Sequence, residues 1–225
     1  AVTKAYVDIS AETNADLTGE VTSDGNETTV SNSAVIGKVL TGFTSGAGTV
    51  DENDNILEAI QKLDGNSPVH YIGEEYGGGI IFYVFDNGQH GLIAATSDMF
   101  RPWYAGTDMY TLATSDGVGA GKANTAIILA LQGVGDGSMY AAKECFRYSN
   151  IMNSVKYSDW YLPSKYELNL LFNQKELTGL NLTNGYYWSS TEAEIDEAWS
   201  QDFTSGNVGS SNKYLGCYVR AVRAF

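Results

Sequence analysis

The chain has 225 residues and a formal net charge of −14, because 27 Asp and Glu outnumber 13 Lys and Arg. A nucleic-acid-binding surface needs a basic face, so this balance argues against a nucleic-acid partner. No stretch reaches the roughly 20 apolar residues of a membrane span, so membrane insertion is not expected. With 43% hydrophobic residues, 15 tyrosines and 25 glycines, the chain can form a core and a tyrosine-rich recognition surface.

Cysteine and histidine are scarce, which narrows the chemistry of any site. Cys145 and Cys217 are too few for a disulfide framework, and whether they pair stays open. The only histidines, His70 and His90, do not stand at zinc-ligand spacing with either cysteine. We therefore expect no catalytic residues, no metal ligands and no cofactor, with a structural calcium ion left open.

Residues 1–66 are predicted to form a fibre-like, oligomerising stalk. Positions 10–50 are rich in Thr, Ser, Gly, Asn and Val and have too little apolar bulk to fold alone. Short strands are expected at 27–30 and 34–40, between turn signals. Strands of this kind can bury a face against copies of themselves.

A short coiled-coil segment is predicted at about 54–64. Asp54 can cap a helix that runs from 55 to 63, and Gly65 can end it. The helix carries apolar residues at spacings of four and three, which form the seam of a coiled coil: Ile56, Ile60 and Leu63. So short a helix is marginal alone. It either docks on the C-terminal domain or self-associates in parallel, and we favour a homotrimer.

A globular α+β domain is expected over 71–225. A hairpin is predicted, with strands at 79–85 and 90–95 joined by a turn at 86–88. Helices are predicted at 123–131, 139–152 and 165–172, and Ser164 and Glu167 form a capping box for the last. Later strands are predicted at 186–189, 198–203 and 213–224. We expect the first and last strands of the domain to be neighbours.

A glycine-rich segment at 117–123 resembles a phosphate-binding loop but departs from its pattern. It has only three residues between Gly117 and Gly121-Lys122, and Ala123 stands where a Mg²⁺-binding Ser or Thr is needed. We interpret it as a flexible glycine loop.

Four motifs in fixed order carry a family resemblance: GGIIFYV (78–84), YSDWYLPS (157–164), YWSSTE (187–192) and YVRAVRAF (218–225). Together they resemble the C-terminal domain of collagen-like bacterial surface proteins, the Lcl type. That family implies a C-type-lectin-like fold related to formylglycine-generating enzymes. The segments at 39–50 and 56–65 are similar to repeats of phage tail fibres and fibrous adhesins.

The motifs favour structural roles over chemistry. Trp160 and Trp188 are expected in the core, and Asp159 is expected to accept backbone or arginine donors. One arginine of the last motif, Arg220 or Arg223, is expected to form a buried clamp with a carboxylate. Many relatives carry a cysteine where Ala221 stands, which weakens an enzymatic interpretation and a family-type disulfide.

The segment 193–218, just before the last motif, resembles the variable region of proteins diversified by retroelements. Adenine-directed mutagenesis of Asn codons cannot yield Trp, Gln or Lys, so Trp199, Gln201 and Lys213 would be scaffold. The exposed, codon-compatible positions are the candidate ligand-binding residues: Ser200, Asp202, Thr204, Asn207, Val208, Ser210, Ser211, Asn212, Tyr214, Leu215 and Tyr218.

These observations favour a non-enzymatic receptor-binding or adhesin tip that recognises a surface protein or glycan. The expected location is extracellular, on a virion tail fibre or a bacterial cell surface. Trp103 and Tyr104 could extend the ligand surface, although core packing is the simpler role. One alternative is a formylglycine-type oxidase or surface-polymer hydrolase, and another is a purely structural fibre or virion decoration protein.

Overall fold

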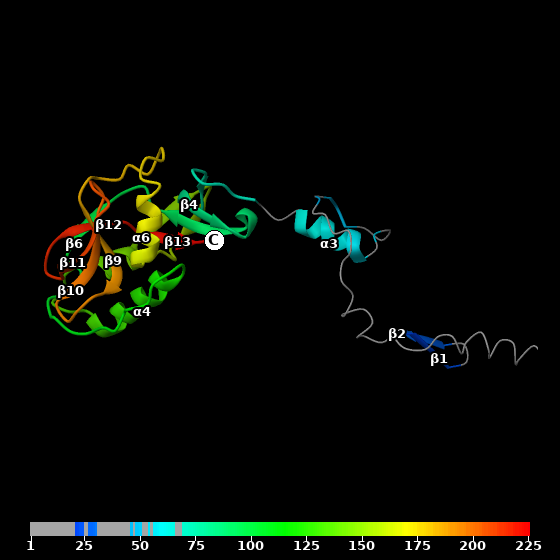
Figure 1. Cartoon of the computed structure of the whole chain (residues 1–225), viewed down its shortest axis with the longest axis horizontal. Helices are drawn as coiled ribbons and strands as arrows, with labels where there is room; N and C mark the ends of the chain where they lie inside the picture. Colours follow the sequence, from blue (N-terminus) through cyan, green and yellow to red (C-terminus); the bar gives the residue numbers. More distant parts are fainter. Residues whose placement is uncertain are drawn as a thin grey trace, which may run out of the picture. The chain divides into compact units, whose positions relative to one another are not determined.

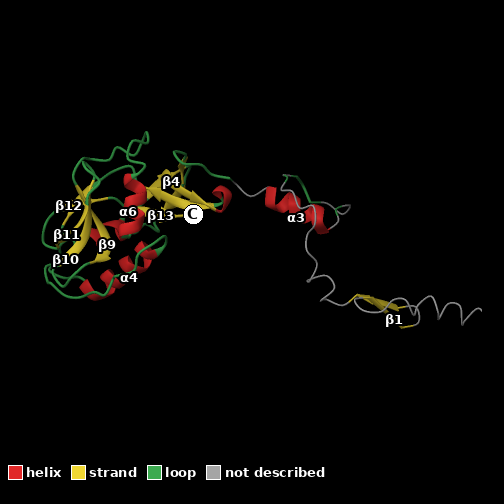
Figure 2. Cartoon of the chain, in the orientation of Figure 1, coloured by secondary structure: helices red, strands yellow, loops and turns green. Residues whose placement is uncertain are grey.

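The computed structural model describes residues 21–24, 27–30, 46, 48–50, 54, 56–65 and 69–225. The chain divides into two compact units, Ala1–Ser67 and Pro68–Phe225 (Figure 1). Helices and sheets are both present in the second unit, so the α+β class is confirmed (Figure 2). Among the described helices, none has the length and apolarity to cross a membrane.

In the first unit, two short strands form an antiparallel hairpin. β1 (Val21–Asp24) pairs with β2 (Glu27–Val30), and Asp24 lies opposite Glu27. The strand predicted at 27–30 is therefore confirmed. The strand predicted at 34–40 lies outside the described residues.

The helix of the first unit exposes its apolar stripe. α3 (Ile56–Gly65) covers the predicted helix and ends at Gly65, as expected. Lys62 Nζ lies 2.5 Å from Oδ1 of Asp54, just before the helix. The stripe residues remain in contact with solvent, at exposed fractions of 66%, 36% and 61% for Ile56, Ile60 and Leu63. The stripe is therefore exposed, and the coiled coil stays a prediction.

The second unit contains a four-stranded sheet in the order β13-β5-β4-β3. Its strands are β3 (Glu75–Tyr76), β4 (Gly79–Phe85), β5 (His90–Ala94) and β13 (Val222–Ala224). The predicted hairpin is confirmed, with a 3-10 turn η1 (Asp86–Gly88) between β4 and β5. The prediction that the first and last strands are neighbours is wrong, because β5 lies between β4 and β13. Because β3 occupies one edge of β4 and β5 the other, β13 pairs with the free edge of β5.

A five-stranded sheet lies in the order β11-β10-β9-β12-β6. Its strands are β6 (Met99–Arg101), β9 (Tyr186–Glu192), β10 (Glu197–Asp202), β11 (Val208–Asn212) and β12 (Cys217–Val219). The predicted strand at 213–224 is wrong as one piece. It consists of β12 and β13, which belong to different sheets, because the chain crosses between them at Arg220 and Ala221. The carbonyl of Ala221 accepts a hydrogen bond from the amide of Ala95 at this crossing.

Three helices of the second unit were anticipated, one of them with the wrong end. α6 (Lys165–Phe172) matches its prediction, including the capping box between Ser164 and Glu167. α4 (Ala120–Gln132) contains the helix predicted at 123–131 and begins three residues earlier. The predicted helix at 139–152 is too long. α5 (Ala141–Arg147) stops early, and β7 (Asn150–Met152) and β8 (Val155–Tyr157) follow as a hairpin. Asn153 and Ser154 both have positive φ, the geometry of a tight hairpin turn that a helix cannot accommodate.

The helices cover and connect the sheets. α6 contacts β4 of one sheet and β9 and β10 of the other, while α4 packs on β9 and α5 contacts β6 and β12 (Figure 2). Trp103, Trp160 and Trp188 are at most 2% exposed, so the two predicted core tryptophans are confirmed. Trp103 also belongs to the core, where its Nε1–H donates to the carbonyl of Ser189. The core thus holds the five-stranded sheet in a fixed shape.

Candidate ligand-binding site

A buried arginine clamp fixes the crossing between the two sheets. Nε of Arg220 lies 2.7 Å from Oδ1 of Asp98, and the guanidinium also donates to the carbonyls of Ala95 and Leu180. The hydroxyl of Tyr187 donates to the other oxygen of Asp98 at 2.6 Å. Burial and the Asp98 carboxylate raise the pKa of Tyr187. The predicted buried clamp is confirmed for Arg220, and its partner Asp98 was not anticipated.

The second arginine of the last motif forms a more exposed pair. Arg223 donates from Nε to Oδ1 of Asp159 at 2.7 Å and from Nη2 to Oδ2 at 3.1 Å. Burial pushes the pKa of Asp159 upward, but the hydrogen bond and charge of Arg223 outweigh it, and the pKa lies below its usual value. Asp159 is therefore an acceptor for arginine, as predicted.

A fully buried ion pair anchors the chain directly after β11. Nζ of Lys213 lies 2.7 Å from Oε1 of Glu192, and both side chains are at most 1% exposed. Lys213 also donates to the carbonyls of Met109 and Ile195, and Glu192 accepts from the amide of Thr111. Lys213 is thus part of the scaffold, in agreement with its codon assignment.

In the glycine-rich segment at 117–123, backbone amides donate hydrogen bonds to the carboxylate of Glu167. The amides of Gly119 and Gly121 donate to the two oxygens of Glu167, at 2.8 and 3.2 Å. A Cβ added at Gly121 would lie 2.3 Å from Oε2 of Glu167. Burial raises the pKa of Glu167 against the lowering effect of these hydrogen bonds. The prediction of a flexible loop is wrong, because the amides that could cradle a phosphate are already occupied.

A hollow of about 560 Å³ runs along the five-stranded sheet, and we call it the sheet hollow. Every strand of that sheet contributes to its lining, from Phe100 on β6 to Val208 on β11. The described residues that line it include no Asp, Glu, Lys, Arg or His. Several apolar side chains on its rim are half or nearly half exposed, at 55% for Phe100, 55% for Tyr186 and 44% for Leu215. This arrangement can bind a group through apolar contact and neutral hydrogen bonds.

Most of the candidate ligand-binding residues lie around the sheet hollow. Seven of the eleven line it: Ser200, Asn207, Val208, Ser210, Ser211, Leu215 and Tyr218. Ser200 is only 1% exposed and lies at the base, where its hydroxyl contacts that of Ser211 at 2.8 Å. The other lining residues of this set are exposed or half-buried.

The remaining four candidates lie outside the lining. Asp202 closes its own turn by accepting from the hydroxyl of Ser205 and the amide of Thr204, and these bonds hold its pKa below the usual range. Asn212 donates weakly to Asp196 at 3.5 Å. Thr204 and Tyr214 are exposed beside the hollow's strands and contribute nothing to its lining.

Two aromatic side chains of the lining were missed by sequence reasoning. Tyr186 immediately precedes buried Tyr187 on β9, so strand alternation places it on the opposite face, and this signal could have found it. Phe100 lies 5.4 Å from Tyr218, ring centroid to centroid, in an edge arrangement. No sequence pattern around Phe100 indicated β6, a strand of three residues.

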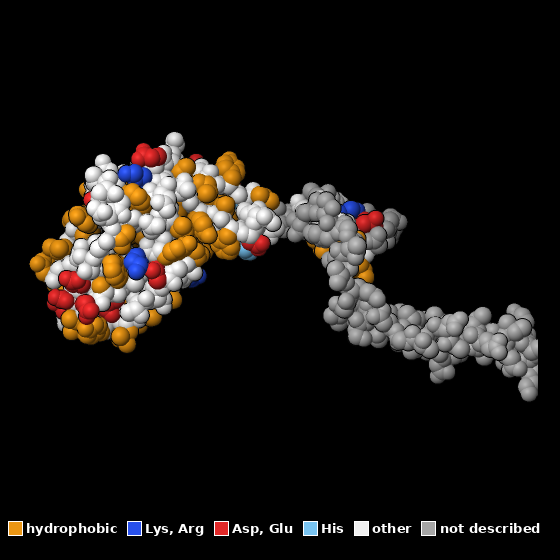
Figure 3. Space-filling model, in the orientation of Figure 1, with side chains coloured by type: hydrophobic (Ala, Val, Ile, Leu, Met, Phe, Trp, Pro, Cys, Tyr) orange, Lys and Arg blue, Asp and Glu red, His pale blue; other side chains and the backbone are white. Residues whose placement is uncertain are grey.

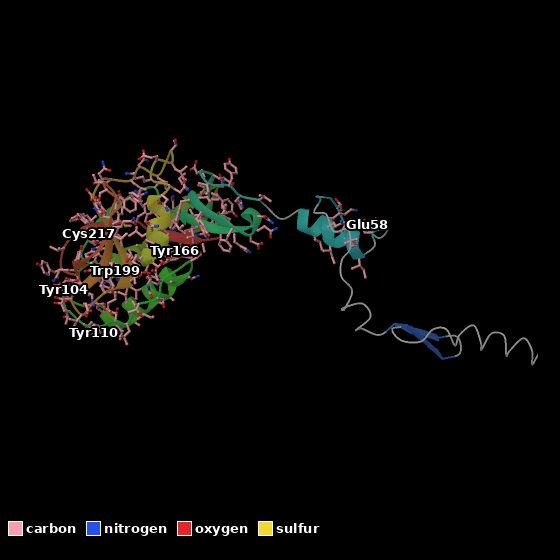
Figure 4. The ribbon with its side chains drawn as sticks, viewed as in Figure 1. Glu58, Tyr104, Tyr110, Tyr166, Trp199 and Cys217 are labelled. Carbon is pink, nitrogen blue, oxygen red and sulfur yellow. The ribbon has the colours of Figure 1, made fainter. Side chains whose placement is uncertain are left out.

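A smaller groove of about 370 Å³, which we call the Trp199 groove, borders β11, the last strand of the five-stranded sheet. Its lining includes Trp199 of β10, Tyr166 of α6 and Val208, which also lines the sheet hollow. Trp199 and Tyr166 lie near each other in Figure 4. Nζ of Lys165 lies 4.4 Å from the centroid of the Trp199 ring, a cation–π contact that fixes the indole. Trp199, predicted as scaffold, is half-buried here.

The two cysteines are separate, buried thiols. Cys145 lies on the buried face of α5, in the core. Cys217 lies on β12 and lines the sheet hollow (Figure 4). Burial raises the pKa of both thiols, and that of Cys217 reaches about 12. Among the described residues, no three His, Cys, Asp or Glu side chains gather as a metal-binding group.

The fold and the site define an α+β domain with a preformed, uncharged hollow on its larger sheet. The family model of the Lcl C-terminal domain matches residues 107–223, more than half of the chain. The chain therefore belongs to the Lcl C-terminal domain family, as its motifs predicted, and this family indicates a surface or adhesin-type protein. No curated protein matches the chain.

Proposed function

We propose that the chain is a non-enzymatic receptor-binding or adhesin tip that recognises a surface protein or glycan. Residues 71–225 form its C-type-lectin-like binding domain, and residues 1–66 form its oligomerising stalk. The proposal rests on one observation above all. The sheet hollow is uncharged, receives residues from all five strands, and has apolar side chains exposed on its rim. Binding sites commonly combine such a concave apolar surface with a few polar groups.

The location follows from the family and the composition. Membership in the Lcl C-terminal domain family favours a surface protein. We propose an extracellular location, either a phage tail fibre or a bacterial cell surface. The net charge of −14 disfavours anionic partners such as nucleic acid.

We also propose that a retroelement diversifies the ligand face within residues 193–218. Lys213 and Gln201, which adenine-directed mutagenesis of Asn codons cannot produce, are at most 1% exposed. Codon-compatible neighbours such as Val208, Ser210 and Leu215 are exposed around the sheet hollow. A separation of this kind would let the face vary while the scaffold stays constant.

A non-enzymatic role is supported by the state of the thiols. A nucleophilic cysteine acts as a thiolate and is usually activated by a lowered pKa. Here burial raises the pKa of both Cys145 and Cys217, so both are protonated near neutral pH. Cys217 is better suited to lining the sheet hollow than to attacking a substrate.

The proposal is tested by ligand screening with matched variants. The full chain is screened on a glycan array and on an array of surface proteins, together with the double variant Tyr186→Ala/Leu215→Ala. We expect the double variant to lose at least tenfold in apparent affinity for any ligand found, because it removes the rim of the hollow.

The control is Ile151→Ala, at a strand position that is 68% exposed and does not line the hollow. It should bind like the original chain. Equal binding by the double variant would place recognition elsewhere.

In parallel, resequencing this gene segment across a natural population should find changes at exposed positions between 200 and 218 and none at Trp199, Gln201 or Lys213. An invariant segment would rule out diversification.

A further inference from the structure

The outermost described strand of the larger sheet has backbone groups that point away from the protein. β11 is last in the sheet order and pairs only with β10 among the described strands. Asp202 N–H donates to the carbonyl of Asn207, and Lys213 N–H donates to that of Asp196. Hydrogen-bonded pairs alternate along an antiparallel ladder, so Gly209 and Ser211 also bond to β10. The amides and carbonyls of Val208 and Ser210 therefore face outward.

This edge lacks the usual protection against strand pairing. Natural edge strands commonly carry lysine, proline or a bulge that blocks another chain. β11 has the sequence Val-Gly-Ser-Ser-Asn, and its register with β10 is regular from Val208 to Asn212. Val208, Gly209 and Ser210 are exposed. The edge is thus open to an added strand.

Both depressions border β11, because Val208 contributes to the lining of each. Side chains at paired positions share a face. Ser210 pairs with Trp199 of the Trp199 groove, and Gly209 pairs with Ser200 of the sheet hollow, whose lining also includes Ser210 and Val208. Successive side chains of a strand alternate between faces. A strand added beside β11 would therefore run along both depressions, with its successive side chains on alternating faces of the sheet.

Charge defines the chemistry of the added strand. The described residues that line the sheet hollow are uncharged, so an apolar or neutral polar side chain fits there. Acidic residues lie at the other end of the edge, because Glu197 pairs with Asn212 and Asp196 bonds to the amide of Lys213. Figure 3 shows acidic side chains gathered over this end of the domain. A basic residue is therefore favoured there, and β11 of a second copy, Val-Gly-Ser-Ser-Asn, carries none.

We propose that the ligand is a protein whose extended segment adds as a strand to β11. Its uncharged central side chains enter the sheet hollow, other side chains border the Trp199 groove, whose lining includes Asp116 and Lys165, and a Lys or Arg lies near Glu197. This inference rests on the proposed function and narrows its ligand from a protein or glycan to an extended peptide segment. Backbone hydrogen bonds supply affinity in this mode, and the two depressions supply sequence preference.

The test uses a phage-displayed library of random 12-residue peptides, selected against the full chain. Enriched peptides are synthesised, and their affinities are measured by fluorescence anisotropy for the original chain, Ser210→Pro and Ile151→Pro. Proline at 210 removes one outward N–H and no backbone hydrogen bond to β10, a position that edge strands tolerate, and it also removes the hydroxyl that donates to Glu197. We expect at least a tenfold loss of affinity for Ser210→Pro and less than a threefold change for Ile151→Pro, which lies outside both depressions.

A second measurement holds even if Ser210→Pro folds poorly. Each peptide is N-methylated at one residue at a time, which removes single backbone donors. Strand addition predicts that binding is lost at every second position. Two outcomes would overturn strand addition and leave the proposed function standing. In the first, peptide affinity is unchanged by N-methylation and by Ser210→Pro. In the second, no peptide is recovered, while a glycan array shows binding that depends on the sheet hollow. If Tyr186→Ala/Leu215→Ala instead keeps full affinity for every ligand found, recognition lies outside the sheet hollow, whereas a chain that binds no ligand on either array would refute the proposed function itself.

Discussion

At the scale of residues, the buried pair of Lys213 and Glu192 holds the end of β11 to the core. The pair is enclosed and lies 2.7 Å apart, with Trp103 beneath the ammonium group. Lys213→Met should lower the free energy of unfolding by about 3–5 kcal/mol, because it leaves the Glu192 carboxylate buried without its partner. Urea unfolding followed by tryptophan fluorescence measures the change.

The double variant Lys213→Met/Glu192→Gln is the matched control. The amide oxygen that Glu192→Gln introduces would still accept from the amide of Thr111, while the buried charge is removed. We expect the double variant to be more stable than Lys213→Met alone. A loss below about 1 kcal/mol for the single variant, the range of exposed ion pairs, would contradict a structural role for this pair.

At the scale of elements, the junction of α4 and α6 depends on a glycine. A Cβ at Gly121 would lie 2.3 Å from Oε2 of Glu167 and 2.6 Å from the amide of Ser164, so the capping box must shift to admit it. Gly121→Ala should cost about 1–3 kcal/mol, as overpacking does. Gly209→Ala is the control, since a Cβ there meets no atom within 4 Å, and it should change stability by less than about 0.5 kcal/mol. Equal unfolding midpoints in urea for the two variants would refute this account.

The elements that could be predicted from the sequence are those with strong local signals. The hairpin of β4 and β5 has an apolar run on each side of a turn, and α6 begins with a capping box, so both were found with nearly correct bounds. The segment 213–224 has no break in its apolar pattern. Its division between two sheets depends on Arg220 reaching Asp98, a contact 122 residues apart in sequence that no local pattern reveals.

The candidate site was also predicted only in part, because some of its residues come from distant parts of the sequence. The codon argument selected a contiguous segment, and seven of its eleven residues line the sheet hollow: Ser200, Asn207, Val208, Ser210, Ser211, Leu215 and Tyr218. It could not find Phe100, which reaches the hollow through the pairing of β6 with β12. Strand β11 also escaped, because Gly-Ser-Ser-Asn has low strand propensity and is ordered by pairing with β10.

At the scale of the whole molecule, the proposed stalk would multiply one binding site. A single uncharged hollow offers modest affinity, and linking several copies can raise the overall avidity by a factor of about 10²–10⁴. The helix α3 supplies a means of assembly, because Ile56 and Leu63 are more than 60% exposed on one stripe. We propose that three chains bury these stripes together in a parallel coiled coil.

The trimer predicts a mass of about 73 kDa in solution, three times the 24.3 kDa of one chain. Sedimentation equilibrium or light scattering measures it directly. Ile60→Asp should shift the mass to that of a monomer, because it places a charge in the apolar seam. Glu58→Gln, on the same helix outside the stripe, should remain trimeric.

Apparent affinity for a ligand-coated surface should fall when Ile60→Asp converts the trimer to a monomer. The Ile60→Asp monomer should keep the affinity of a single site for soluble ligand and lose at least about a hundredfold in apparent affinity for the surface, since only avidity is removed. A stable monomer in the unaltered chain would contradict the trimer and would leave the alternative that α3 docks on residues 71–225. In that case Ile60→Asp would change the free energy of unfolding and leave surface binding per molecule unchanged.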